Sequence, residues 1–343
     1  MLFRSLALEV GYGLIPLVDQ SQDGQLLNRI RSIRGQIAQE IGILIPAVHI
    51  QDNMQLAPGA YSILLRGNEV GKGELMMNHL LAMSAGGSPE KLNGIPTKEP
   101  TYGLAAYWIK KEAKEEALSR GYTVVDLPTV LITHLSEIMR RHADELVGRQ
   151  EIQKLLDDLK ETYPKVVEDL IPNQLSLGVL VKVLQNLLRE QVPVRDLLTI
   201  LETLADWAPA TKDVNALTEK VRQSLARTIT RCLQAADGEI HLLTVGQSIE
   251  KTLLGALQHA EPGGLVPLDP DAAHQIAENI IRHLERFSSM NQQPALLCSA
   301  QIRPHLKGLL DQFIPNLTVV SYNEIVNTVG IQPLGIVELS NAD

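Results

Sequence analysis

The stretch from Val181 to Trp207 reads VKVLQNLLREQVPVRDLLTILETLADW. Apolar residues recur at helical spacing on both sides of Pro193. Proline lacks a backbone N–H and disfavours helix at the residue before it, so the first helix is expected to end near Val192. The stretch therefore predicts a hairpin of two amphipathic helices that bury their leucine stripes.

Helical periodicity extends outward from this hairpin over residues 127–235. Prolines and capping residues divide this segment, so several helices of ordinary length are expected rather than one long helix. The expected helices cover residues 129–146, 149–161, 164–170, 177–190, 195–207 and 214–234.

Mixed strand and helix patterns flank the helical segment on both sides, over residues 1–125 and 239–343. Near the N-terminus, Gly13 to Val18 is expected to be extended and Gly67 to Gly73 to be a tight turn. The many glycines and prolines of Ser84 to Pro100 predict a loop. Strand patterns around that loop indicate a small insert between two pieces of a larger domain.

Composition restricts the class of protein. A chain of 343 residues is expected to form two to four domains, and 45% hydrophobic with 21% charged residues is typical of globular proteins. A net charge of −9 argues against nucleic acid as a partner. No uncharged apolar run reaches the roughly 18 residues that span a bilayer. Cys232 and Cys298 lie far apart, which fits a reducing cytosol without a disulfide framework or zinc site.

Sequence motifs for catalysis or cofactor binding are missing or incomplete. The chain has no GxxxxGK[ST], HExxH or GxSxG, and Gly11-Tyr12-Gly13 lacks the third glycine of a dinucleotide fingerprint. His274 and His283 are nine residues apart, which places them on opposite sides of one helix. We therefore expect no cofactor, no metal and no enzymatic activity.

Ordered blocks carry more specific information. They read EVGYGLIPLVD at 9–19, RIRSIR at 29–34, VHIQDNM at 48–54, EPTYGL at 99–104, GYTVV at 121–125 and GRQE at 148–151. Together with the hairpin, these blocks resemble the cytoplasmic part of the FHIPEP family, the export-gate proteins of flagellar and virulence type III secretion. The resemblance covers nearly the whole chain and is looser over the last hundred residues.

The resemblance implies a fold of α/β plus all-α class with several domains. A discontinuous α/β first domain (5–77 and 127–146) would hold a small inserted α/β domain (78–126), followed by a helical domain (147–226) and a C-terminal α/β domain (227–343). It also implies a homo-oligomeric ring, usually a nonamer, at the cytoplasmic face of the bacterial inner membrane. Family members carry a membrane-spanning N-terminal region that this chain lacks.

The resemblance further implies protein partners. These are flagellar export chaperones with bound late substrates, the export ATPase complex with its stalk, and the switch component of the export gate. Chaperones would bind in a dimple between the first domain and the insert. Motif matching assigns Glu99 as the acid of that site, Tyr102 as its aromatic residue and Thr133 as its hydroxyl. Pro100 and Gly103 belong to its loop. Its apolar walls are Met83, Val125 and Val130.

Two residues of this site depart from the family pattern, which often has Asp and Phe where this chain has Glu99 and Tyr102. A tyrosine on a loop rich in proline and glycine suits an interface anchor, and a carboxylate beside it can accept hydrogen bonds from a partner. Without the resemblance, a simpler interpretation is favoured, in which Tyr102 packs the insert against its neighbour and Glu99 caps a turn.

Other residues keep two interpretations open. Gly11 matches a family glycine near a hinge of the first domain, or is an ordinary glycine at a strand bend. Arg29, Arg31 and Arg34 either pair with acids of a neighbouring subunit or form a solvated helix face. For the whole chain, the alternatives to an export-gate docking platform are a cytosolic α/β enzyme with an unrecognised small-molecule site and a winged-helix nucleic-acid binder.

Overall fold

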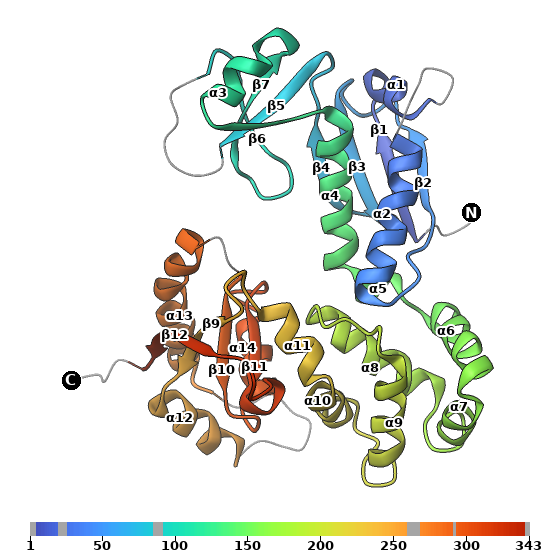
Figure 1. The fold of residues 1–343 in the computed structure, drawn as a ribbon, viewed down its shortest axis with the longest axis vertical. Coiled ribbons are helices and arrows are strands. Elements are labelled where there is room, and N and C mark those ends of the chain that lie inside the picture. The colour runs from blue at the N-terminus through green and yellow to red at the C-terminus, as the bar shows by residue number, and fades with distance from the viewer. Residues whose placement is uncertain (1–4, 20–25, 85–91, 259–267, 291–292, 340–343) are drawn as a thin grey trace. The chain divides into compact units, whose positions relative to one another are not determined.

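A computed structural model describes residues 5–19, 26–84, 92–258, 268–290 and 293–339. The chain divides into two compact units (Figure 1). The N-terminal unit contains residues 1–155 and 193–195, and the C-terminal unit contains residues 156–192 and 196–343. No helix within the described residues is long and apolar enough to cross a membrane.

The first sheet of the N-terminal unit has the strand order β2-β1-β3-β4. The central strand β1 pairs with β2 in parallel and with β3 antiparallel, and its alternate residues Leu6, Leu8 and Val10 are buried. Helices α2 and α4 pack against one another beside this sheet (Figure 1). The elements are β1 (Leu6–Val10), η1 (Tyr12–Leu14), α1 (Ile15–Val18), α2 (Leu26–Ile41), β2 (Val48–Asp52), β3 (Ala60–Leu65), β4 (Asn68–Glu74), α4 (Leu127–Arg141) and α5 (Ala143–Leu146).

A second sheet of the same unit has the order β6-β7-β5-β8, and every neighbouring pair in it is antiparallel. Helix α3 packs beside β8, and a small apolar core around Ala82, Ile109 and Tyr122 fills the space between them. The elements are β5 (His79–Ser84), β6 (Ile95–Lys98), β7 (Ala105–Lys110), η3 (Lys111–Ala113), α3 (Lys114–Ser119) and β8 (Tyr122–Val125).

The two amphipathic helices predicted on either side of Pro193 are confirmed, and they meet through α10 rather than as a closely packed hairpin. These helices, α8 and α9, begin at side-chain caps, where Ser176 accepts from Val179 N and Asp196 from Thr199 N. Both helices pack against α10 and bury their leucines. The predicted helix over 214–234 is two helices, which meet at Leu225. The helices of this segment are α6 (Arg149–Thr162), α7 (Pro164–Leu170), α8 (Leu177–Arg189), α9 (Leu197–Trp207), α10 (Val214–Ser224) and α11 (Ala226–Leu233).

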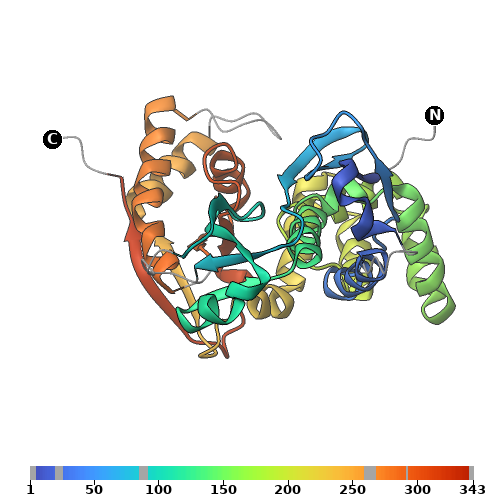
Figure 2. The same ribbon diagram turned by 90° about the horizontal axis from the view of Figure 1, so that it is seen from above.

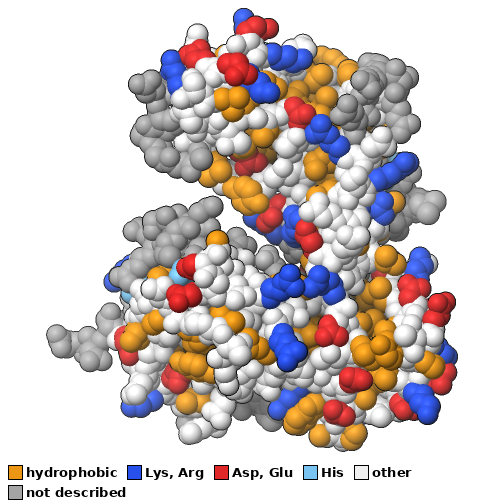
Figure 3. Space-filling model, in the orientation of Figure 1, with side chains coloured by type: hydrophobic (Ala, Val, Ile, Leu, Met, Phe, Trp, Pro, Cys, Tyr) orange, Lys and Arg blue, Asp and Glu red, His pale blue; other side chains and the backbone are white. Residues whose placement is uncertain are grey.

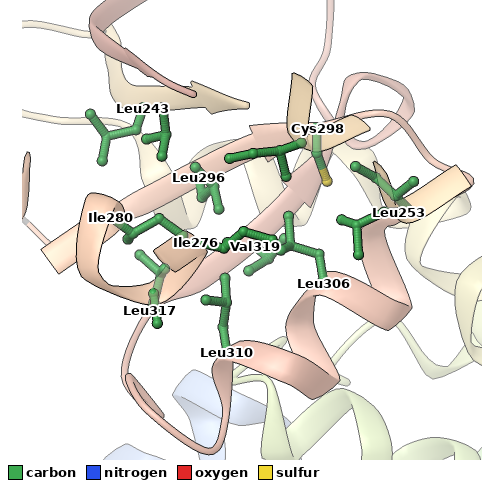
Figure 4. Packing of buried hydrophobic residues seen from close by; sticks show 14 of the residues in the cluster. Leu243, Leu253, Ile276, Ile280, Leu296, Cys298, Leu306, Leu310, Leu317 and Val319 are labelled. Atoms are coloured by element: carbon green, nitrogen blue, oxygen red, sulfur yellow. The ribbon is translucent and has the colours of Figure 1, made fainter. Parts of the chain in front are cut away.

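The C-terminal sheet is parallel throughout, with the order β11-β10-β9-β12. Helix α13 lies against β12 and α14 against β11 (Figures 1 and 2). Leucine, isoleucine and valine side chains from strands and helices fill the core between them (Figure 4). The elements are β9 (Ile240–Val245), α12 (Gln247–Leu257), α13 (Pro270–Met290), β10 (Ala295–Cys298), α14 (Arg303–Leu310), β11 (Thr318–Ser321), η4 (Tyr322–Glu324) and β12 (Ile331–Val337).

Three local predictions are wrong. Gly13 to Val18 is helical rather than extended, with Pro16 in the first turn of α1, where a proline needs no N–H partner. Gly67 to Gly73 is mostly strand β4, because Arg66 and Gly67 make the turn and the later glycines pair with β3. The expected loop from Ser84 to Pro100 contains strand β6, and its residues 85–91 lie outside the described residues. The four domain boundaries stay a prediction.

Candidate functional site

The candidate site is built around the turn that joins β6 to β7, residues Glu99 to Leu104. Both ends of the turn are closed by backbone bonds, from Glu99 N to Leu104 O at 2.8 Å and from Gly103 N to Glu99 O at 2.9 Å. The Glu99 carboxylate accepts from Thr101 N at 2.8 Å and from Tyr102 N at 2.7 Å. With 4% of its surface exposed, Glu99 holds the turn from inside.

Tyr102 lies at the outer end of this turn and is 60% exposed. Gly103 follows it with φ at +71°, a conformation that glycine adopts without the steric cost other residues incur. Pro100 fixes the backbone on the other side of the turn. The turn therefore presents a large ring to solvent on a backbone that its own hydrogen bonds keep in place.

Thr101 is a residue of this turn that the sequence did not single out. Only 8% of it is exposed, and its hydroxyl has no hydrogen-bond partner among the described residues. A buried hydroxyl without a partner costs free energy, so such a group calls for an explanation. The sequence carried no signal for it, because burial of a loop threonine depends on the packing around it.

Helix α4 supplies the charged side of the site. Thr133 is half-buried, and Glu137 follows it one turn later on the same face. Partial burial and the charge of Glu137 raise the pKa of the Tyr102 hydroxyl, so this hydroxyl remains a hydrogen-bond donor at neutral pH. Val130 is 2% exposed, so it belongs to the core and offers little surface to a partner.

Met83 and Val125 lie on the two neighbouring strands β5 and β8. Both are half-buried, and Met83 pairs in register with Ala106 of β7, close to the end of the Glu99–Leu104 turn. Val125 pairs with Leu81 and stands directly before Asp126, the residue that caps α4. The structure thus brings Met83 near the turn and Val125 to the start of α4.

A neutral polar pair lies between the first sheet and α4. The Tyr61 hydroxyl is 2.8 Å from His134 Nδ1, and their rings meet edge to face. Burial lowers the pKa of His134 and, with the charge of Glu99, raises the pKa of Tyr61.

Gly11 has a packing reason to be glycine. Its N–H donates to Ala60 O at 2.8 Å, and a Cβ at this position would lie 2.1 Å from Ala57 O. Its φ of −66° is ordinary, so close approach of the backbone at Ala57 is the constraint. A hinge role for Gly11 stays a prediction.

Two of the three arginines on α2 have partners inside their own unit. Arg29 donates to Thr129 Oγ1 at 2.9 Å and pairs with Asp126 at 3.1 Å. Arg34 donates to Ile45 O at 2.7 Å. Arg31 is exposed, so it is the one of the three that the fold leaves most accessible to another molecule.

The C-terminal sheet bears on the enzyme alternative. In parallel sheets, ligands bind beyond the carboxyl ends of the strands where the strand order reverses, which here is between β9 and β12. At that point the Glu338 carboxylate accepts from Ser248 N and from the Ser248 hydroxyl at the start of α12. Gly246 allows this approach, because a Cβ there would lie 2.1 Å from the Glu338 carboxylate. The chain's own acid thus occupies this helix N-terminus.

The winged-helix alternative requires a basic surface. Over the described residues of the face drawn in Figure 3, acidic and basic side chains are interspersed. That face offers no uninterrupted basic stripe that could follow a nucleic-acid backbone.

Comparison with known sequences defines the class of this protein. The FHIPEP family profile matches residues 1–330 of the chain. The chain therefore belongs to the FHIPEP family of export-gate proteins, and the resemblance inferred from the ordered sequence blocks is confirmed.

Individual relatives make this identification more specific. The flagellar biosynthesis protein FlhA of Bacillus subtilis is 44% identical over 334 residues, which are 97% of this chain and 49% of that protein. The chain thus spans about half the length of this curated relative.

Solved structures share the fold. The Chlamydia pneumoniae CdsV protein, solved in a complex with CdsO, superposes with a TM-score of 0.85 at 27% identity, covering 98% of this chain and 99% of that one. The nonameric EscV cytosolic domain of a type III secretion system gives a TM-score of 0.75 at 25% identity, covering 98% and 97%.

Proposed function

We propose that this chain is a non-enzymatic docking platform of the flagellar type III export gate. It receives export chaperones loaded with late substrates and hands the substrates on for secretion. The observation that carries the proposal is the Glu99–Leu104 turn, which presents Tyr102 on a preorganised backbone. A preformed turn loses little conformational freedom when a partner binds, so more of the contact energy remains as affinity.

Within this proposal the residues have separate roles. Tyr102 is the anchor, because an exposed aromatic ring with a polar tip gives a large contact area for few frozen rotors. The buried hydroxyl of Thr101 would gain its missing hydrogen bond from the partner or from a trapped water. Glu99 positions the turn, since both of its carboxylate oxygens already accept backbone N–H groups.

We also propose that the chain works as one subunit of a ring, as supported by the nonameric EscV cytosolic domain. The CdsV–CdsO complex supports a further protein partner, and the export ATPase complex with its stalk and the switch component of the gate are the proposed candidates. We also propose attachment at the cytoplasmic face of the bacterial inner membrane, as the place where an export gate works.

The experiment that tests the docking site is Tyr102→Ala, with affinity for a purified flagellar chaperone–substrate complex measured by calorimetry. We expect affinity to fall by about tenfold or more, as for truncation of an aromatic anchor at an interface centre. Tyr102→Phe, which keeps the ring, should retain most of the affinity.

Tyr322→Ala is the matched control, because Tyr322 is a tyrosine of similar exposure, 56%, that belongs to the other compact unit. Its affinity should equal that of the unchanged chain. Equal affinities for Tyr102→Ala and Tyr322→Ala, with unchanged melting profiles, would reject Tyr102 as the anchor.

A further inference from the structure

Metal-ligating side chains gather where β9 begins. Asp237, Glu239 and His241 each offer one ligand atom, and these atoms all lie within 4.8 Å of one another. The two carboxylates are exposed, whereas His241 is 6% exposed. Sequence motifs predicted no metal site, although these residues alternate as Asp-x-Glu-x-His at the start of a strand.

The local backbone explains why these side chains converge. Gly238 has φ at +85° and donates to Ala235 O at 3.0 Å, which makes a tight turn before the strand. Asp237 Oδ1 accepts from Glu239 N at 3.0 Å, so its other carboxylate oxygen faces the histidine. His241 follows Glu239 by two residues, so the two side chains lie on the same side of the extended backbone.

A fourth donor comes from the neighbouring strand. Gln332 of β12 pairs in register with His241 of β9. Its Oε1 lies 3.0 Å from His241 Nε2, and Asp237 Oδ2 lies 3.3 Å from the same nitrogen. Two oxygen acceptors therefore face one ring nitrogen, which holds either a proton or a cation between them.

The spacing of these donors fits a small divalent ion. Four donors at about 2.0–2.1 Å from a tetrahedral zinc stand roughly 3.3 Å from one another. The two separations from His241 Nε2, 3.0 Å to Gln332 Oε1 and 3.3 Å to Asp237 Oδ2, are close to that edge length, and the ligand atoms of Asp237, Glu239 and His241 all lie within 4.8 Å of one another. One imidazole with carboxylates and an amide oxygen favours zinc or a similar transition metal, since calcium and magnesium prefer six or more oxygen ligands.

We propose that Asp237, Glu239 and His241, with the amide oxygen of Gln332, form a binding site for a divalent transition metal such as zinc. The exposed carboxylates admit the ion from solvent, and the buried histidine fixes its position. A bound ion would join the turn before β9 to the edge strand β12, so it would stabilise the C-terminal sheet.

The test is calorimetric titration of the chelator-treated 343-residue chain with zinc chloride, and with magnesium chloride for comparison. We expect one zinc per chain and no comparable heat with magnesium. Asp237→Asn keeps an oxygen to cap the turn but removes the charge, and His241→Gln removes the imidazole. Each should weaken zinc binding at least tenfold, as loss of a direct ligand does.

His142→Gln is the matched control, because His142 Nδ1 also lies near one carboxylate oxygen, 2.8 Å from Glu145 Oε1, but belongs to no three-ligand group among the residues that the structure describes. Zinc affinity should not change in this variant. Absence of saturable zinc binding to the unchanged chain would overturn the proposal. The proposal would also be overturned if Asp237→Asn bound zinc with the same affinity as the unchanged chain. Asp237 is exposed, so this substitution should leave the fold intact.

Discussion

Two buried polar centres, one in each unit, avoid the cost of burial in different ways. The ionic centre of the C-terminal unit consists of Glu190, Glu219, Arg222, Arg303 and Glu324. The neutral centre of the N-terminal unit is the Tyr61–His134 pair. Buried charges must be paired, whereas neutral polar groups need only hydrogen bonds. The ionic centre therefore depends on several distant residues, and the neutral centre depends on protonation state.

Arg303 joins most of the ionic centre. Its guanidinium, 1% exposed, donates to Glu190 Oε2 at 2.6 Å and makes a two-pronged contact with Glu219. Arg222 donates to Glu190 at 2.9 Å and also to Glu324. These contacts tie the helices α8 and α10 to α14 and to the turn after β11 within one unit.

The largest effect is expected for Arg303→Ala, which removes the two-pronged partner of the half-buried Glu219 and leaves the half-buried Glu190 with Arg222 alone. Truncating one member of a buried ion pair costs about 3–5 kcal/mol. Urea unfolding followed by tryptophan fluorescence measures the loss. The chain has two tryptophans, and Trp108→Phe leaves Trp207 of the C-terminal unit as the reporter.

Arg282→Ala is the control for this prediction, since the Arg282–Glu278 pair is exposed and its charged atoms are 3.7 Å apart. An exposed pair contributes about 0–1 kcal/mol, so this variant should unfold almost like the unchanged chain. If both variants lost equally little stability, the ionic centre would not hold the unit together.

Whether the sequence could predict a region depends on how far apart its interacting residues lie along the chain. The two helices on either side of Pro193 and the Glu99 turn are local, so proline, capping residues and glycine indicated them directly. The hydrogen-bond partners of Arg303 in the ionic centre, Glu219 and Glu190, lie 84 and 113 positions away along the chain. No periodicity links such positions, so only the fold reveals them. For the same reason, the sequence could not show whether Glu99 is buried within its turn or exposed as a contact for a partner.

A second, smaller effect is expected in the N-terminal unit for Glu99→Ala. The Thr101 and Tyr102 N–H groups would lose their carboxylate acceptor, and a buried donor left without a partner costs about 1–3 kcal/mol. In a Trp207→Phe background, Trp108 on the adjacent strand β7 reports the unfolding of this unit.

Glu112→Ala is the matched control, because Glu112 is an exposed carboxylate in η3, just after the same strand. Its free energy of unfolding should stay within about 0.5 kcal/mol of the unchanged chain. A loss for Glu99→Ala no greater than for Glu112→Ala would mean that the turn keeps its shape without the carboxylate. Glu99 would then be available to a partner.

The smallest effect concerns pH and separates the two centres by the pH range in which each loses stability. Burial is the main cause that lowers the pKa of His134, so the folded chain binds its proton less readily than the unfolded chain. Stability from this residue is therefore present above the ordinary histidine pKa of about 6.5 and is lost as pH falls below it. Burial would raise the pKa of Glu190, but Arg222 and Arg303 outweigh it and lower that pKa. Its contribution is therefore lost only in stronger acid, below about pH 4.3.

Between pH 7 and 5.5, the free energy of unfolding reported by Trp108 should fall by about 1 kcal/mol at most because of His134. His134→Gln keeps an acceptor for the Tyr61 hydroxyl but cannot take up a proton, so this part of the pH dependence should vanish. His142→Gln should leave it unchanged, since His142 lies outside the Tyr61–His134 pair. An equal pH dependence in all three chains would show that His134 does not titrate in this range on unfolding. The neutral centre would then resist acid as well as the ionic centre does, and the difference between the two would lie in their partners alone.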